Sequence, residues 1–200
     1  MADWSFGETL LVAHTVGEAL LAVGADWYVG GSVASSVHGI PRATQDADIV
    51  AALRPGHGKR LAELLGEAFY IDAETAERAI RARRSFNLIH LETMFKVDVF
   101  VLRPDAYGLR AMAERLVRVV SEEPPISLPV ATPEDTVAHK LYWYRLADET
   151  SEKQWRDLIG VLKTLRGRID VPRLRLASSD LGVGDLVDAA LEAAGALEGG

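Results

Sequence analysis

Apolar and polar positions follow two periods, and stretches of each period alternate through the first 120 residues. Apolar residues three or four positions apart predict helices with one buried face, and short runs of valine, isoleucine and aromatic residues predict strands. The expected helices span residues 6–23, 32–37, 58–69, 73–83 and 106–116. The expected strands span residues 26–29, 46–53, 86–91, 95–102 and 117–120. Only three residues separate the third strand from the fourth, which is too few for a crossover, so these two are expected to form an antiparallel hairpin.

The pattern changes at the turn-rich segment Ser121-Glu122-Glu123-Pro124-Pro125, and beyond it the chain is mainly helical. The clearest helix start is at Thr132, a good capping residue that is followed by a proline and two acids. We therefore expect a core of residues 1–120 and a C-terminal helical subdomain of residues 121–200. The helices expected in this subdomain span residues 132–146, 151–165 and 186–194.

Three carboxylates lie on two of the expected strands. Asp46 and Asp48 share one face of the expected strand 46–53 because side chains alternate along a strand. Asp98 lies between valines on the expected strand 95–102, on the same face as Lys96. An acid in an apolar run is costly to bury unless it is paired or bound to a metal. If the two strands are neighbours, the three acids converge and would repel one another unless cations lie between them. A salt bridge from Asp98 to Lys96 is the structural alternative.

Composition narrows the class of protein. The chain has 200 residues, 48% of them hydrophobic, which is enough for a folded core. It has no cysteine, which excludes disulfides, thiolate metal sites and a cysteine nucleophile. The apolar stretch 10–23 contains His14 and Glu18 and follows no basic segment, so it is too short and too interrupted for a membrane span or a signal peptide. We expect a cytoplasmic protein with no membrane contact.

The net charge of −7 argues against general nucleic-acid binding, although basic residues are unevenly distributed. Two runs are rich in basic residues: Arg78, Arg81, Arg83 and Arg84 in one, and Lys163, Arg166, Arg168, Arg173 and Arg175 in the other. Such runs are typical of solvated helix faces, and contact with a polyanionic substrate is the alternative.

Five blocks in this order resemble the nucleotidyltransferase superfamily, and most closely its AbiEii-like abortive-infection toxin branch. An Asp-x-Asp motif alone is a weak signal, whereas several matching blocks in the right order are a strong one. The resemblance covers roughly residues 26 to 160. The blocks are Gly30-Gly31-Ser32, Arg42 to Ile49, Lys96-Val97-Asp98-Val99, Thr132 to Leu141, and Arg156-Asp157.

The resemblance implies an α/β fold with a small mixed sheet flanked by helices, the first 120 residues forming the catalytic core. It also implies attack on the α-phosphorus of a nucleoside triphosphate such as ATP, with release of pyrophosphate. Asp46 and Asp48 would bind two Mg²⁺ ions, and Asp98 would hold the catalytic ion and help to deprotonate the acceptor hydroxyl. The triphosphate would lie against Gly30, Gly31 and Ser32 and against Lys140. Each of these phosphate-binding candidates has a simpler structural alternative: a tight turn for the two glycines, a helix cap for Ser32, and a surface lysine for Lys140.

Three functions remain open from the sequence. The first is nucleotidyl transfer to a macromolecule, a tRNA end or a protein side chain, by the toxin of a toxin–antitoxin system with a cognate antitoxin as partner. The second is the same chemistry on a small molecule such as an antibiotic. The third is a non-catalytic member that binds a nucleotide or a partner. All three acids and the glycine turn are present, which argues against the third.

Overall fold

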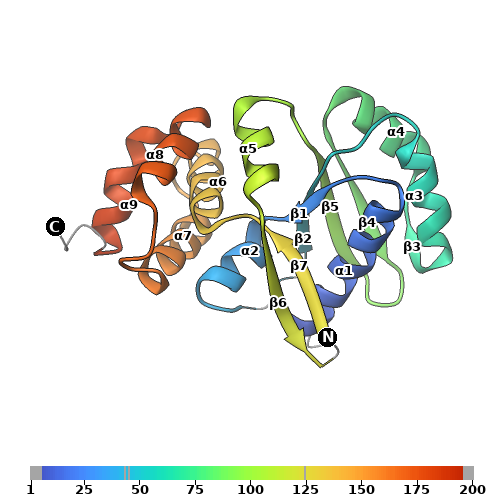
Figure 1. Ribbon diagram of the computed structural model, residues 1–200, viewed down its shortest axis with the longest axis horizontal. Helices are drawn as coiled ribbons and strands as arrows, with labels where there is room; N and C mark the ends of the chain where they lie inside the picture. Colours follow the sequence, from blue (N-terminus) through green and yellow to red (C-terminus); the bar gives the residue numbers. More distant parts are fainter. Residues whose placement is uncertain (1–5, 43, 45, 124, 196–200) are drawn as a thin grey trace. The chain divides into compact units, whose positions relative to one another are not determined.

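A computed structural model describes residues 6–42, 44, 46–123 and 125–195 (Figure 1). The described residues form a mixed seven-stranded sheet in the order β3-β4-β5-β2-β1-β7-β6. The expected α/β fold with a small mixed sheet is therefore confirmed. The strands are β1 (Trp27–Val29), β2 (Asp46–Ala51), β3 (Phe69–Tyr70), β4 (Ser85–His90), β5 (Phe95–Val101), β6 (Leu116–Glu122) and β7 (Pro125–Val130).

The described residues form nine α-helices and two short 3₁₀ turns, η1 (Gly66–Ala68) and η2 (Gly184–Leu186). Most of the expected helices are present within a few residues of their predicted ends. Among the described residues, none of these helices combines the length and the hydropathy needed to cross a membrane. The helices are α1 (Phe6–Ala22), α2 (Gly31–His38), α3 (His57–Leu65), α4 (Ala73–Ala82), α5 (Ala106–Glu114), α6 (Pro133–Leu146), α7 (Glu152–Thr164), α8 (Val171–Asp180) and α9 (Val187–Ala193).

The chain divides into two compact units, of which the first holds residues 1–33 and 43–130 and contains the whole sheet. Alternate residues of β2 and β5 face a core in which Ala47, Ile49, Val97 and Val99 are fully buried. Helix α1 packs against both of these strands, and α4 packs against α3 and β4. The other side of β2 and β5 is only half-buried, as the alternating burial along both strands shows. One face of the sheet thus holds the core and the other is partly open.

The second unit holds residues 34–42 and 131–200, so the division passes through α2 and falls after β7. Helix α6 packs against α7 and α8, and α7 packs against α9. The apolar side chains Leu141, Leu158 and Leu174 are fully buried in this unit. The sequence suggests a boundary at residues 121–125, of which residue 124 lies outside the described residues; Glu122 of β6 pairs there with Pro125 of β7. The strand β7 and the helix α8 are elements that the sequence pattern did not predict.

Candidate active site

The three carboxylates lie on the half-buried side of β2 and β5. These strands are parallel neighbours in a register that pairs Asp48 with Asp98 and Asp46 with Lys96. The condition for convergence, that the two strands are neighbours, is met by this pairing. Side chains of paired residues in neighbouring strands project from the same face of the sheet, separated by about 5 Å at their Cβ atoms. Asp46, Asp48 and Asp98 therefore project from the same region of the sheet.

Lys96 is the cation at this cluster. Its Nζ atom lies 2.7 Å from Oδ2 of Asp98. The pKa of Lys96 is raised, chiefly by this hydrogen bond, against an opposing effect of partial burial; the charges of Asp98, Asp46 and Asp48 raise it further. The ammonium thus senses all three carboxylates, which places them within electrostatic reach of one point. The salt bridge considered as the structural alternative for Asp98 is present.

The carboxylate cluster fits a magnesium ion by its chemistry, because Mg²⁺ prefers carboxylate oxygens and commonly takes only one or two protein carboxylates together with substrate phosphates. Within residues 6–42, 44, 46–123 and 125–195, no three His, Asp or Glu side chains are already grouped as ligands of one ion. This agrees with the Lys96 contact, since one oxygen of Asp98 is directed at an ammonium group. The donors are present and adjacent, and metal binding would draw Asp98 away from Lys96.

The glycine turn lies directly beside these acids. The N–H of Gly30 donates to the carbonyl oxygen of Asp48 over 2.8 Å. Gly31 has a φ of +54°, and a Cβ atom at this position would stand 1.6 Å from Oδ2 of Asp48. Only glycine satisfies both conditions. Helix α2 begins at Gly31, so Ser32 lies in its first turn and is buried there.

Thr44 positions the first acid, a role that the sequence did not define. Its Oγ1 atom lies 2.8 Å from Oδ1 of Asp46 and 3.1 Å from the Asp46 carbonyl oxygen. Thr44 is buried, and its own carbonyl accepts a hydrogen bond from the hydroxyl of Thr9 on α1. A buried hydroxyl two residues before Asp46 thus restrains the rotamer of that carboxylate. A threonine two positions before the Asp-x-Asp pair was the available sequence signal.

Lys140 belongs to the second compact unit, where it is buried on α6. Its Nζ atom lies 2.9 Å from Oδ2 of Asp157 on α7. Arg42 donates to both carboxylate oxygens of Asp157, over 3.1 Å and 2.9 Å. Burial acts to raise the pKa of Asp157, but the hydrogen bonds and charges of Arg42 and Lys140 outweigh it and hold the pKa below 3.8. Lys140 is therefore a buried ion-pair partner, and the surface-lysine alternative is wrong.

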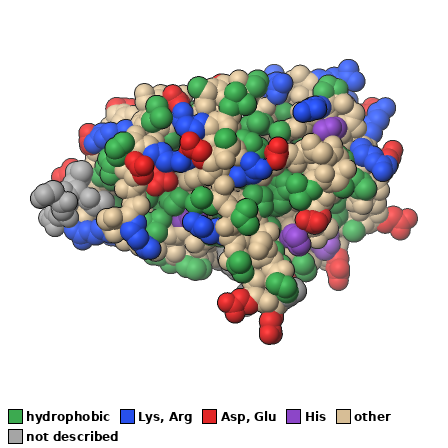
Figure 2. Space-filling model, viewed as in Figure 1, with side chains coloured by type: hydrophobic (Ala, Val, Ile, Leu, Met, Phe, Trp, Pro, Cys, Tyr) green, Lys and Arg blue, Asp and Glu red, His purple; other side chains and the backbone are tan. Residues whose placement is uncertain are grey.

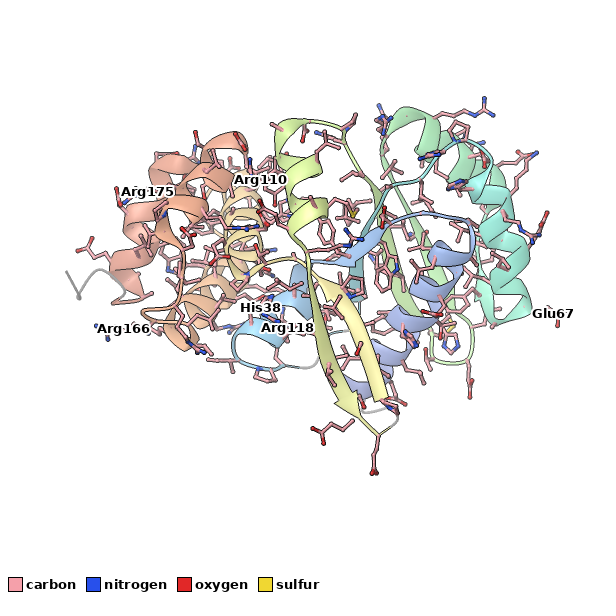
Figure 3. All side chains as sticks on the ribbon, viewed as in Figure 1. His38, Glu67, Arg110, Arg118, Arg166 and Arg175 are labelled. Atoms are coloured by element: carbon pink, nitrogen blue, oxygen red, sulfur yellow. The ribbon has the colours of Figure 1, made fainter. Side chains whose placement is uncertain are left out.

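The histidines serve other contacts. His38 at the end of α2 (Figure 3) lies with Nε2 2.7 Å from the carbonyl oxygen of Ala131, so this nitrogen carries the proton. His90, which could have reached the acids, lies with Nδ1 2.7 Å from the hydroxyl of Thr93 and packs on the ring of Phe69. His38 and His90 thus make contacts within their own parts of the fold.

The sheet, its order and the placement of the acids define the chain as a protein of nucleotidyltransferase fold. Two solved structures share this fold. The antibiotic-resistance factor ANT(2'')-Ia, solved in solution, has a TM-score of 0.51 at 13% identity and covers 94% of this chain and 97% of its own. An antigenic nucleotidyltransferase-like protein from Paracoccidioides brasiliensis has a TM-score of 0.54 at 16% identity, with 93% of each chain covered.

The family follows from the sequence itself. The model of the nucleotidyl transferase AbiEii toxin family, of type IV toxin–antitoxin systems, matches residues 19–181. The chain belongs to this family and is a nucleotidyltransferase. No curated protein matches the chain.

Proposed function

We propose that the chain transfers a nucleoside monophosphate from a nucleoside triphosphate to an acceptor hydroxyl, with Asp46, Asp48 and Asp98 as the catalytic carboxylates. The observation that carries the proposal is the β2–β5 register, which places Asp48 beside Asp98. The negative charges of all three acids act on Lys96 and raise its pKa. So much negative charge on one open sheet face suits a cation-bound triphosphate. Membership of the nucleotidyltransferase toxin family supports the same chemistry.

Asp46, Asp48 and Asp98 would hold Mg²⁺, which when bound neutralises phosphate charge and lowers the pKa of the acceptor hydroxyl. In the reaction, an oxygen–phosphorus bond forms from the acceptor to the α-phosphorus, and the bond from that phosphorus to the bridging oxygen breaks. Pyrophosphate leaves with the electron pair, and the hydroxyl proton passes to the Asp98 carboxylate.

The remaining residues bind and orient. Backbone N–H groups at the start of α2, from Gly31 and Ser32, supply the positive end of a helix to the triphosphate. Thr44 holds the Asp46 carboxylate in one orientation. Gly31 leaves room for the Asp48 carboxylate beside the turn. A triphosphate contact from Lys140 stays a prediction.

For the acceptor, we propose a tRNA end or a protein side chain, with growth inhibition as the result and a cognate antitoxin that opposes it. The family of type IV toxin–antitoxin systems supports this choice. Transfer to a small antibiotic-like hydroxyl compound is the second candidate, favoured by the shared fold of the antibiotic-resistance factor.

The test is transfer of label from α-³²P nucleoside triphosphates in the presence of Mg²⁺. The acceptors are total tRNA, cell-extract protein and an aminoglycoside, each assayed separately. The wild type should label tRNA or protein and release pyrophosphate. Asp98→Asn should lower the rate by several orders of magnitude and retain nucleotide binding, because Asp46 and Asp48 remain.

Each other outcome has a definite meaning. Labelling of the aminoglycoside alone would replace the macromolecular acceptor with a small molecule. Wild-type transfer by Asp98→Asn would overturn the assigned role of Asp98. Absence of triphosphate binding at millimolar concentration would support a non-catalytic binding protein instead.

A further inference from the structure

A surface hollow of about 510 Å³ lies in the first compact unit, where α4 passes into β4 and β5 passes into α5. Both of its walls carry arginines. Figure 2 shows basic side chains over the end of the molecule where Figure 1 places α4. The lining residues are Ala82, Arg83, Arg84, Arg103, Pro104 and Asp105.

Arg83 is held in place by backbone geometry that normally selects glycine. It ends α4 with a φ of +49°, in the left-handed region. The N–H of Arg83 donates to Ile80 and that of Arg84 donates to Ala79, the paired bonds of a Schellman turn. Glycine is the usual residue at this position because it has no Cβ. An arginine is therefore unusual at this position.

The guanidinium group of Arg83 is oriented by a hydrogen bond from one terminal nitrogen to the carbonyl oxygen of Leu102, over 2.9 Å. In the described part of the chain, no hydrogen bond or ion pair engages the side chains of Arg84 and Arg103. Asp105, the carboxylate of the lining, accepts a hydrogen bond from the N–H of Gly108 and so caps α5. Three arginines against one engaged carboxylate leave the hollow strongly positive, and guanidinium groups match phosphate oxygens in geometry.

An open strip of sheet connects this hollow with the carboxylate cluster. Phe100 lies two residues beyond Asp98 on the same face of β5. On the neighbouring strand β4, Asn87 pairs with Asp98 and Ser85 pairs with Phe100. Asn87 and Ser85 are exposed, and Phe100 is half-buried. Arg103 lies five positions after Asp98, which is at most about 17 Å of extended chain. At about 3.4 Å per nucleotide, this distance corresponds to about five stacked nucleotides.

We propose that the Arg83–Arg84–Arg103 hollow is a phosphate-binding subsite that holds a phosphodiester group of a polynucleotide acceptor whose reacting end lies at Asp98. The proposal rests on the proposed function and adds a second contact for the acceptor, several nucleotides away from the carboxylates. Phe100 provides an aromatic ring on the connecting strip, on which a base can stack.

The test is binding of a short fluorescein-labelled single-stranded RNA, measured by anisotropy over a range of salt concentrations. Arg84→Gln/Arg103→Gln removes two cations of the hollow. Each phosphate contact on a single strand contributes about 0.7 to the slope of log K against log salt, so the slope should fall by about 1.4. The matched control is Arg60→Gln/Arg118→Gln, which removes the same charge from α3 and from β6, where Figure 3 labels Arg118, and should leave the slope unchanged.

A third variant separates binding from folding. Arg83→Gly places the preferred residue at a left-handed position, so its unfolding temperature should not fall. Its RNA affinity should fall, because the oriented guanidinium group is lost.

The proposal is overturned if Arg84→Gln/Arg103→Gln binds the RNA as the wild type does, even if that variant has lost affinity for inorganic phosphate. Equal weakening by the control pair also overturns it, since bulk charge would then account for the effect. The binding assay needs no turnover, so the variant Asp46→Asn/Asp48→Asn should still show the RNA affinity and salt dependence that the hollow contributes. A failure of the transfer proposal is thereby distinguished from a failure of this one.

Discussion

At the scale of single residues, Gly31 is the position of the carboxylate site that is least able to accept a larger side chain. Its backbone is left-handed, and any Cβ atom would overlap Oδ2 of Asp48 at 1.6 Å. Gly24, which follows α1, also has a positive φ, +74°, but nothing lies within 4 Å of its Cβ position. The two glycines therefore separate backbone strain from collision with the carboxylate.

Gly24→Ala should lower the free energy of unfolding by about 1–2 kcal/mol through strain alone. Gly31→Ala should cost roughly 1–3 kcal/mol more, because Asp48 or the turn must move. Chemical denaturation of both variants measures the difference. Equal losses would show that the turn beside Asp48 accommodates a methyl group, and the described geometry would be wrong there.

Asp157 is the second residue with a sharp expectation, because it neutralises two cations while buried. Its side chain is 5% exposed, and that of Lys140 is 4% exposed. Asp157→Asn leaves the Lys140 ammonium buried without its counter-charge, which should cost about 3–5 kcal/mol of stability. The control is Asp188→Asn, which breaks an exposed ion pair with Arg175 and should change stability little.

The pH dependence of this effect has a definite sign. The pKa of Asp157 is lower in the folded chain than its ordinary value of 3.8. The stabilisation is therefore fully present above this value and is lost as the pH falls through the lower, folded value. Urea denaturation between about pH 3 and pH 7 should show the gap between wild type and Asp157→Asn narrowing at the acidic end. A gap that widens on acidification would contradict the assigned charge state.

At the scale of elements, α3 depends on a carboxylate from α4. Gly56 precedes α3 and offers no side-chain cap. Glu77 instead accepts the N–H groups of Gly56, Gly58 and Lys59 at 2.9–3.3 Å. Burial acts to raise the pKa of Glu77, but these backbone donors outweigh it and lower the pKa below 4.5. The pair of helices is thus joined by a charged cap.

Glu77→Gln keeps the shape and removes the charge, so it should cost about 1–2 kcal/mol. Hydrogen exchange at the amides of Gly58 and Lys59 should accelerate most, because a neutral amide group replaces the charged carboxylate that accepts from both. Glu63→Gln on the exposed face of α3 is the control. Unchanged exchange at both amides would show that Glu77 does not cap the helix.

The elements also show what sequence pattern can and cannot predict. The hairpin of β4 and β5 was predicted because periodicity and a short connection both indicated it. Strand β7 was missed because Pro125 and Pro129 suggest a break in any strand, although β7 pairs along its length with β6. Helix α8 was missed because Arg173 and Arg175 suggested a solvated run, yet Leu174 is buried between them. Tertiary packing outweighed local composition in both cases.

At the scale of the whole molecule, the candidate site is assembled from segments far apart in the chain. Alternation along each strand was enough to predict that Asp46, Asp48 and Asp98 share a face. Their register could not be predicted, because it depends on a parallel pairing across about 50 residues that no local pattern specifies. That Lys140 and Arg42 both bind the Asp157 carboxylate could not be predicted either, since it depends on how distant segments pack.

The central claim is that these three carboxylates form one cation-dependent nucleotide site. The most direct measurement is a titration with Mn²⁺, in place of Mg²⁺, in the presence of a non-hydrolysable triphosphate, with free Mn²⁺ followed by electron paramagnetic resonance. The wild type should bind up to two ions per chain, and Asp46→Asn/Asp48→Asn/Asp98→Asn should lose this binding while it keeps its circular dichroism spectrum. Binding of Mn²⁺ by the triple variant with wild-type affinity and stoichiometry would contradict the claim.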